Sequence, residues 1–219
     1  MNAGESFSLF TLFKMGGVFM WPLLLFSVAT LTLIVERVIY ICCHNLKVED
    51  LAANLNLYIR EHNTKGALEY LKKNSIRRPA ARILLTLTEN MNLPTASLEK
   101  SVEAEASSCI ISLESGFDFL VALGSLAPLT GFLGTVSGMI GAFKSIAEAT
   151  DVNAQIVANG IYEALITTVY GLIIAIVAMI GHSLLSHSID KFSANIEKYC
   201  STLITSIETI KHENENKNV

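Results

Sequence analysis

Three long apolar segments constrain the fold of this chain more than any other feature. The segment Phe119–Phe143 contains 25 consecutive residues without a formal charge. Another runs over Gly16–Val35, and a third lies within residues 152–189, where Glu163 is the only acid. A helix that crosses a bilayer needs about 20 mostly apolar residues, because lipid offers the backbone no hydrogen-bond partner. With 51% hydrophobic and 16% charged residues, the chain is predicted to be a membrane protein with three spans.

Lysine and arginine residues are distributed unevenly around these segments. Most of them lie between the first and second spans or in the tail, whereas the N-terminus contributes Lys14 and the connection between the second and third spans contributes Lys144. Because basic loops remain on the cytoplasmic side, the long connection and the tail are predicted to be cytoplasmic. The predicted organisation is an outward-facing N-terminus (1–15), transmembrane helix 1 (16–43), a cytoplasmic helical loop (44–94), a cytoplasmic helix that continues into transmembrane helix 2 (95–144), a periplasmic turn (145–155), transmembrane helix 3 (156–188), and a cytoplasmic helix with the tail (189–219).

The predicted cytoplasmic segments have apolar residues at helical spacing. In the loop we interpret Gly66 as a break between two helices, and Pro79 and Thr95 as helix starts. From Thr95 the apolar steps of three and four residues continue without a strong breaker before Pro128, which predicts one helix from cytoplasm into membrane. Similar steps extend the third helix beyond Ile189. Such stripes need partners, within one chain or between copies, and the fold class is all-α.

Small residues form a stripe along the second span. Gly131, Gly134, Gly138 and Ala142 recur within a few turns, and small residues let membrane helices approach closely. The alternative is that the glycines are merely compositional, since glycine is common in membrane helices. Pro128 is predicted to bend this helix, freeing a carbonyl group that the hydroxyl of a nearby threonine such as Thr130 or Thr135 can satisfy.

Glu163 is the strongest candidate for a functional residue. A charge at mid-membrane costs about 2.5 kcal/mol or more. The alternative is an interfacial glutamate stabilised by a helix N-terminus, and the sequence leaves the depth of Glu163 open. Thr167 lies one turn further along the same helix, and Thr168 points toward a neighbouring face. Their hydroxyl groups can donate to a carboxylate or relay a proton, or can bond back to carbonyl groups of their own helix.

Other classes of function have little support in the sequence. The net charge of −4 and the mixing of acids with bases indicate no nucleic-acid surface. His182 and His187 fall on different helix faces, so we expect no metal site, and the four cysteines are predicted to remain reduced. We find no catalytic constellation, and we expect neither enzymatic activity nor a cofactor.

Two of the spans resemble a known family. The string APLTGFLGTVSGMIGAF, residues 127–143, closely resembles the second-span signature of the ExbB/TolQ branch of the MotA/TolQ/ExbB proton-channel family. The string GIYEALITTVYGLIIAI, residues 160–176, resembles the third-span signature. Val177 replaces the proline that usually follows this signature, and Tyr170 stands where smaller or aliphatic side chains are usual, in the pore or in a packing gap.

The resemblance implies an assembly and a function. It implies a pentamer with a central pore occupied by two ExbD/TolR-like helices, in the bacterial inner membrane, with a periplasmic N-terminus and a cytoplasmic C-terminus. Proton passage would then transmit force to a TonB- or TolA-like protein. Residues Glu163, Thr168 and Thr135, with Thr167 beside them, would face the pathway, and Gly171 would join the glycines that pack the pore helices. The alternative is a structural membrane scaffold without a proton pathway.

Overall fold

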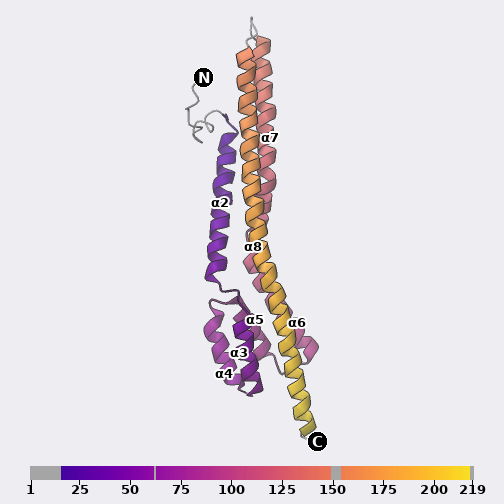
Figure 1. Cartoon of the computed structure of the whole chain (residues 1–219). Helices are drawn as coiled ribbons and strands as arrows, with labels where there is room; N and C mark the ends of the chain where they lie inside the picture. The colour runs from indigo at the N-terminus through magenta and orange to yellow at the C-terminus, as the bar shows by residue number, and fades with distance from the viewer. Residues whose placement is uncertain (1–15, 62, 149–153, 218–219) are drawn as a thin grey trace. The chain divides into compact units, whose positions relative to one another are not determined.

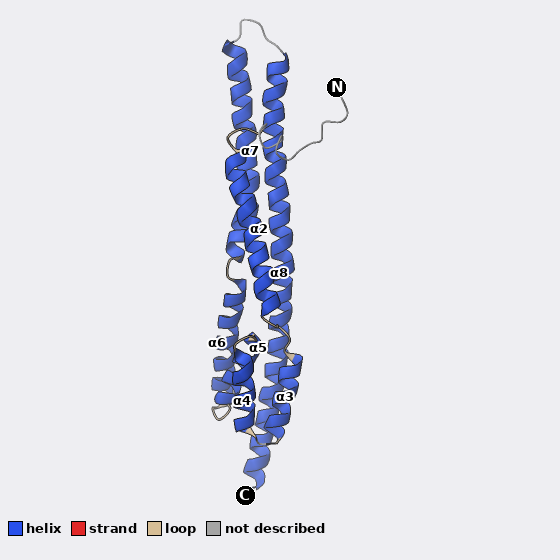
Figure 2. Cartoon of the chain, turned by 90° about the vertical axis from the view of Figure 1, so that its left-hand side faces the viewer, coloured by secondary structure: helices blue, strands red, loops and turns tan. Residues whose placement is uncertain are grey.

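The computed structural model describes residues 16–61, 63–148 and 154–217, and within them it contains helices and loops but no strand (Figures 1 and 2). The predicted N-terminal segment 1–15 and the middle of the predicted turn 145–155 lie outside the described residues. The all-helical class is confirmed. The helices are α2 (Met20–Cys43), α3 (Glu49–Arg60), α4 (Thr64–Ser75), α5 (Pro79–Glu89), α6 (Thr95–Glu114), α7 (Phe117–Glu148) and α8 (Ala154–Lys217).

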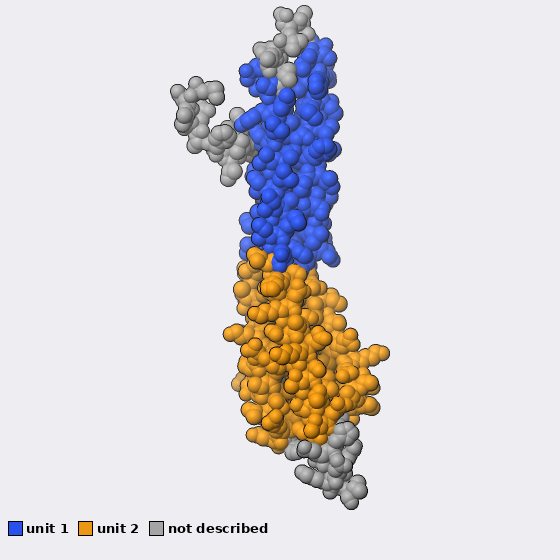
Figure 3. Space-filling view, turned by 45° about the vertical axis from the view of Figure 1, so that its right-hand side comes forward, with its two compact units in different colours: residues 1–36, 116–183 blue, residues 37–115, 184–219 orange. Residues whose placement is uncertain are grey.

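The chain divides into two compact units, which are coloured separately in Figure 3. The first unit comprises residues 1–36 and 116–183, and the second comprises residues 37–115 and 184–219. Three stretches are long and apolar enough to cross a membrane: Met20–Cys43, Thr95–Glu148 and Ala158–Ile210, with mean hydropathies of 1.9, 1.8 and 2.3. The prediction of three membrane-spanning helices is therefore confirmed at the level of length and composition.

The helix predicted to run unbroken from Thr95 into the second span is interrupted. α6 ends at Glu114, Ser115 has φ −50° and ψ 129°, and Gly116 has φ 87°. An extended residue followed by one with positive φ is the geometry of a type II turn, which favours glycine at its third position. The prediction of one continuous helix was wrong, because Gly116 supplies a left-handed conformation that ends α6 and lets α7 begin at Phe117.

In the first unit, α2 packs against α8 and the middle of α7. Met20, Leu23, Ala127 and Ile174 form a buried cluster, and the partly buried side chains packed against it are Phe26, Ile166 and Tyr170. Tyr170 therefore fills space between helices of one chain. Each buried aliphatic or aromatic side chain of this kind contributes roughly 1.5–3 kcal/mol when it leaves water, although in lipid the gain comes from packing.

The second unit is built from α3, α4, α5, α6 and the last part of α8. The predicted break between two helices exists, but it lies between Arg60 and Thr64, and Gly66 is inside α4. The helix begins instead after Asn63, whose side-chain Oδ1 accepts a hydrogen bond of 3.0 Å from the Gly66 amide. This is the usual way in which asparagine caps a helix. Pro79 begins α5 and Thr95 begins α6, so these two predicted starts are confirmed.

The apolar stripe of α8 beyond the third span is buried within the chain. Ile189, Phe192, Ile196, Leu203 and Ile207 are each at most 4% exposed. Their partners are in the second unit of the same chain, where Thr95 donates a hydrogen bond of 2.5 Å to Glu208. The sequence left open whether this stripe packs within one chain or between copies, and the structure places it within one chain.

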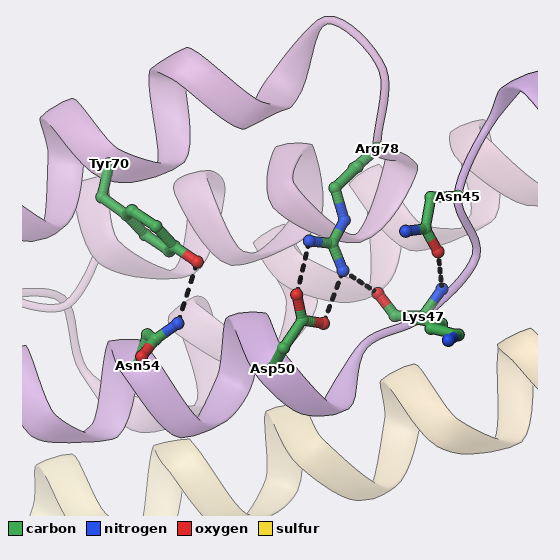
Figure 4. Close-up of polar contacts among 6 residues, drawn as sticks. All are labelled: Asn45, Lys47, Asp50, Asn54, Tyr70 and Arg78. Atoms are coloured by element: carbon green, nitrogen blue, oxygen red, sulfur yellow. Dashed lines mark hydrogen bonds and ion pairs between the residues drawn. The ribbon is translucent and has the colours of Figure 1, made fainter.

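A bidentate ion pair joins the loop after α4 to the start of α3 (Figure 4). Arg78 precedes Pro79, and a residue before proline is held in an extended conformation, as its φ of −131° and ψ of 107° show. Its guanidinium donates to both carboxylate oxygens of Asp50 at 2.6 Å and to the carbonyl of Lys47 at 2.6 Å. Nearby, Asn54 donates to the Tyr70 hydroxyl at 2.9 Å.

Asp50→Asn should destabilise the second unit in a pH-dependent way. The hydrogen bonds from Arg78 hold the pKa of Asp50 below its ordinary value of 3.8. A carboxylate whose pKa is lowered by folding adds stability above its unfolded pKa, and that stability is lost as the pH falls through the lower, folded pKa. Because Asp50 is 54% exposed, we expect a loss of only about 1 kcal/mol at pH 7.

The measurement is the rate at which dithiodipyridine, which reacts even in acid, labels the buried thiols of Cys109 and Cys200. The full-length protein in detergent carries serine at Cys42 and Cys43, which are exposed. Labelling should be faster in Asp50→Asn at pH 7, and the two proteins should converge as the pH falls below the lowered pKa of Asp50. Equal labelling rates at pH 7 would show that the ion pair adds no stability.

Candidate functional site

Helices α7 and α8 run antiparallel in the first unit and meet along a seam of small residues. At Gly171 of α8 an added Cβ would lie 2.5 Å from the Ala127 carbonyl oxygen and 3.3 Å from the Pro128 Cα. At Gly131 of α7 it would lie 2.7 Å from the Thr167 carbonyl oxygen. These are backbone atoms, so glycine is needed where the two helices approach most closely.

The seam continues toward the connection between the two helices. A Cβ at Gly134 would meet the Thr167 hydroxyl at 2.5 Å, and one at Gly138 would meet the Ala164 Cβ at 3.1 Å. Ala142 approaches Gly160, where an added Cβ would lie 2.6 Å from that of Ala142. The glycine stripe therefore packs two helices of the same chain.

The hydroxyl groups of Thr167 and Thr168 both face the Gly131 carbonyl. Thr167 Oγ1 lies 3.1 Å from that oxygen and 2.7 Å from the Ala164 carbonyl oxygen of its own helix. Thr168 Oγ1 donates to the Gly131 carbonyl oxygen at 3.2 Å. Thr167 is 1% exposed, whereas Thr168 is only partly buried. The buried hydroxyl of Thr167 thus links the helices and makes no hydrogen bond to Glu163.

Thr135 and Pro128 lie on α7 within the same span. The Thr135 hydroxyl donates to the Phe132 carbonyl oxygen at 2.7 Å. It therefore does not bond to the carbonyl of Gly124, which lacks its usual helical donor because Pro128 has no amide hydrogen. For Thr135 the prediction was wrong, because a threonine hydroxyl reaches carbonyls three or four residues back on its own helix. α7 continues through Pro128 as one helix, from Phe117 to Glu148.

The carboxylate of Glu163 lies beside the start of α2. Its side chain is exposed, and its Oε1 atom occupies the place that a Cβ of Gly17 would take. Glu163 is nine residues after the start of α8, about 14 Å along the helix axis. Along the axis of α8, Glu163 is therefore at the same height as the residues immediately before Met20, where α2 begins.

The structure brings some of the predicted residues together and separates others. Thr167 and Thr168 converge on Gly131, within the glycine seam. Glu163 lies on the side of α8 that also carries Ile166 and Tyr170, which pack toward α2. On an ideal helix Glu163 and Thr168 are about 140° apart. Within one chain the carboxylate and the Thr168 hydroxyl therefore do not form one polar cluster.

Two residues of this site were missed by the sequence analysis. Gly160 opens the third-span signature and contacts Ala142 across the seam, and Gly17 contacts Glu163. The available signal for Gly17 was its place in a Gly-Gly pair directly before an apolar run, since glycine often marks a turn. Its partner could not be found that way, because residues 17 and 163 are far apart in the sequence.

Residues 72–198 match the MotA/TolQ/ExbB proton channel family, and this stretch is more than half of the chain. The chain belongs to this family. The match includes all of α7, with its glycines, and the part of α8 that carries Glu163, Thr167 and Thr168. Membership and three membrane-capable helices make it a multi-pass protein of the bacterial inner membrane.

Individual members of the family show how far the similarity extends. The biopolymer transport protein exbB1 of Vibrio cholerae is 29% identical over 187 residues, which cover 83% of this chain and 80% of the relative. An ExbB-like biopolymer transport protein of Synechocystis sp., ExbB-like 3, is 34% identical over 172 residues, covering 75% and 79%. The Tol-Pal system protein TolQ of Haemophilus influenzae is 38% identical over 103 residues, covering 47% and 43%. The ExbB and TolQ names place the chain in the ExbB/TolQ branch.

Proposed function

We propose that this chain is the proton-channel subunit of an inner-membrane complex that converts the proton motive force into mechanical work. The proposal is supported by the position of Glu163 and of two threonines, Thr167 and Thr168, on α8. These residues lie in the part of the chain, α7 and α8, that matches a proton channel family. An ionisable residue in a membrane segment is by default a functional candidate. Glu163 would influence the charge of the pathway, with Thr168 and Thr135 as polar positions along it, while Thr167 fastens α7 to α8.

The proposed complex requires further chains. Five copies would surround a pore lined by α7 and α8, and two ExbD/TolR-like helices inside it would provide the acid that carries protons. The N-terminus would be periplasmic and the tail cytoplasmic, as the distribution of Lys and Arg indicates. A TonB- or TolA-like protein would receive the force. Support for these partners comes from the ExbB and TolQ names of the relatives.

The surfaces and energies of the first unit are compatible with this role. Large apolar side chains remain exposed on both pore-helix candidates, among them Phe132, Ile140, Leu165 and Leu172. An apolar constriction resists leakage because water leaves it. One proton that crosses 100 mV releases about 2.3 kcal/mol, so a few protons suffice to drive a conformational cycle.

Glu163→Gln should reduce proton uptake when the chain and its partner are reconstituted in liposomes. The substitution keeps the size of the side chain and removes its charge, and a loss of about 1.4 kcal/mol of stabilisation corresponds to a tenfold lower rate. Proton uptake is measured with an internal pH-sensitive dye after a potassium diffusion potential is applied. We expect about a tenfold reduction in the Glu163→Gln complex.

The matched control is Glu148→Gln, which makes the same chemical change at the end of α7, where Glu148 pairs with Lys144 at 3.9 Å. Its uptake should stay within about twofold of the wild type, because an exposed pair of this kind contributes little. Native mass spectrometry must show that each complex is assembled. If an assembled Glu163→Gln complex transports protons at the wild-type rate, the proposed role of Glu163 is contradicted, and a structural scaffold without a proton pathway becomes the better explanation of this chain's function.

A further inference from the structure

Gly17 has a backbone conformation and a position that exclude a side chain. Its φ is +66°, in the left-handed region that L-residues other than glycine rarely adopt. An ideal Cβ at this residue would overlap sterically with the Oε1 atom of Glu163, and it would also lie 3.0 Å from the Glu163 Cδ. All three of the nearest atoms belong to Glu163. The space that glycine leaves vacant at this position is therefore filled by the carboxyl group.

The surrounding turn explains why the carboxyl group is favoured there. The Met20 amide donates to the Gly17 carbonyl at 3.3 Å, and the Trp21 amide donates to the Val18 carbonyl at 3.3 Å. The chain thus enters α2 through tight turns that begin at Gly17. This end of a helix carries a partial positive charge, which favours an anion beside it.

The same face of α8 is fixed further along by packing. Glu163, Ile166, Tyr170 and Ile174 follow one another at steps of three and four residues, and the last three pack at the cluster around Met20 and Leu23. Residues at this spacing share one helix face. The contact between Glu163 and Gly17 therefore continues the contact between α2 and α8 toward the start of α8.

We propose that Gly17 is a positioning residue for Glu163. Because Gly17 has no side chain, the carboxylate of Glu163 can lie against the first turn of α2. This contact holds Glu163 at one place along the proton pathway. Gly17 itself carries no proton. The inference rests on the proposed function, and it assigns to the first span a task in proton transfer that is separate from anchoring the chain.

The test is a double-mutant cycle that combines Gly17→Ala with Glu163→Asp. A methyl group at position 17 displaces the carboxylate, because the flexible end of Glu163 yields more easily than backbone. Aspartate is shorter by one methylene group, so its oxygen atoms reach about as far as the Glu163 Cδ, which would lie 3.0 Å from the added methyl group. The methyl group therefore displaces the carboxylate much less in the Glu163→Asp background. The strain of alanine at a positive φ is the same in both backgrounds and cancels in the cycle.

We expect Gly17→Ala to lower proton uptake by about fivefold in the otherwise wild-type complex and by less than twofold in the Glu163→Asp background, a difference that the cycle reports as coupling. Gly17→Asn serves as a second variant, since asparagine tolerates positive φ but still carries a Cβ, and it should behave like Gly17→Ala. Assembly of every complex is checked by native mass spectrometry.

An equal effect of Gly17→Ala in the two backgrounds, or no effect in either, would overturn the positioning role. This outcome is distinct from failure of the proposed function, which is judged by Glu163→Gln alone. If Glu163→Gln slows proton uptake while the cycle shows no coupling, Glu163 acts on the pathway without help from Gly17.

Discussion

Gly171→Ala will separate α7 from α8 and strongly destabilise the first unit. The added methyl group would lie 2.5 Å from the Ala127 carbonyl oxygen and 3.1 Å from its carbonyl carbon. Both atoms belong to the backbone of α7, so no rotation of a side chain can relieve the overlap. Overpacking of a well-packed contact costs typically 1–3 kcal/mol, and we expect about 3 kcal/mol here. Gly131→Ala, with a contact of 2.7 Å to the Thr167 carbonyl oxygen, should behave alike.

The matched control is Gly141→Ala on α7, where an added Cβ has no neighbour within 4 Å. All three variants gain the same helix propensity, about 1 kcal/mol for glycine to alanine, so the difference between them isolates the steric cost. Unfolding by SDS is followed in mild detergent by the fluorescence of Trp21, the single tryptophan of the chain. The midpoint should fall for Gly171→Ala and Gly131→Ala, and should stay or rise for Gly141→Ala.

If Gly171→Ala and Gly141→Ala unfold at the same SDS concentration, the close approach of the two helices is not a source of stability. Size measurement by native mass spectrometry adds a second readout. Gly134→Leu would also crowd the seam, since a Cβ at Gly134 would already lie 2.5 Å from the Thr167 hydroxyl. Because the seam lies within one chain, a loss of oligomers in this variant would follow from a damaged subunit. It would not by itself show that Gly134 lies between subunits.

Phe192→Ala will destabilise the second unit more than any single surface substitution. Phe192 is 2% exposed and is among the largest fully enclosed side chains of the described residues. It lies on the inner stripe of α8, and removal of a buried phenylalanine ring costs about 3–5 kcal/mol, because transfer and cavity contributions add. The expected result is a rate of Cys200 and Cys109 labelling that is at least about a hundredfold higher, since each 1.4 kcal/mol is a factor of ten.

Leu57→Ala is the control for this measurement, because Leu57 belongs to α3 of the same unit but is 58% exposed. A substitution at such a site usually changes stability by at most about 0.5 kcal/mol. Both variants carry serine at Cys42 and Cys43. Similar protection of Cys200 in Phe192→Ala and in the parent protein would mean that the α8 stripe is not part of the core of this unit.

The apolar pattern predicted which segments are helical and which faces are buried, but local breaks depended on single residues. The spacing from Ile189 onward agrees with the buried face of α8. Gly66 and Gly116 look alike in the sequence, yet Gly66 lies inside α4 and Gly116 ends the run between α6 and α7 with φ 87°. The Ser-Gly pair at 115–116 is a turn signal, which our prediction did not count as a strong breaker.

For the candidate site, the sequence identified the residues but not their partners. The glycine stripe of α7 was recognised as a packing surface, whereas its partner, the Gly160–Gly171 face of the same chain, depends on how two distant segments align. Glu163 was recognised as an unusual carboxylate, and the two threonines as possible donors to it. Their hydroxyl groups instead reach Gly131, and the carboxylate reaches Gly17.

The sequence by itself determined that this chain forms long apolar helices and that it belongs to a proton channel family. It also showed that the second span is distinguished by its glycines and the third by one acid. These properties follow from residue types at fixed spacing, which hydropathy and helical geometry translate directly. Only the tertiary structure decided that the glycines join α7 to α8 and that Glu163 meets the start of α2. Such contacts join residues far apart in sequence, and close packing in three dimensions selects them.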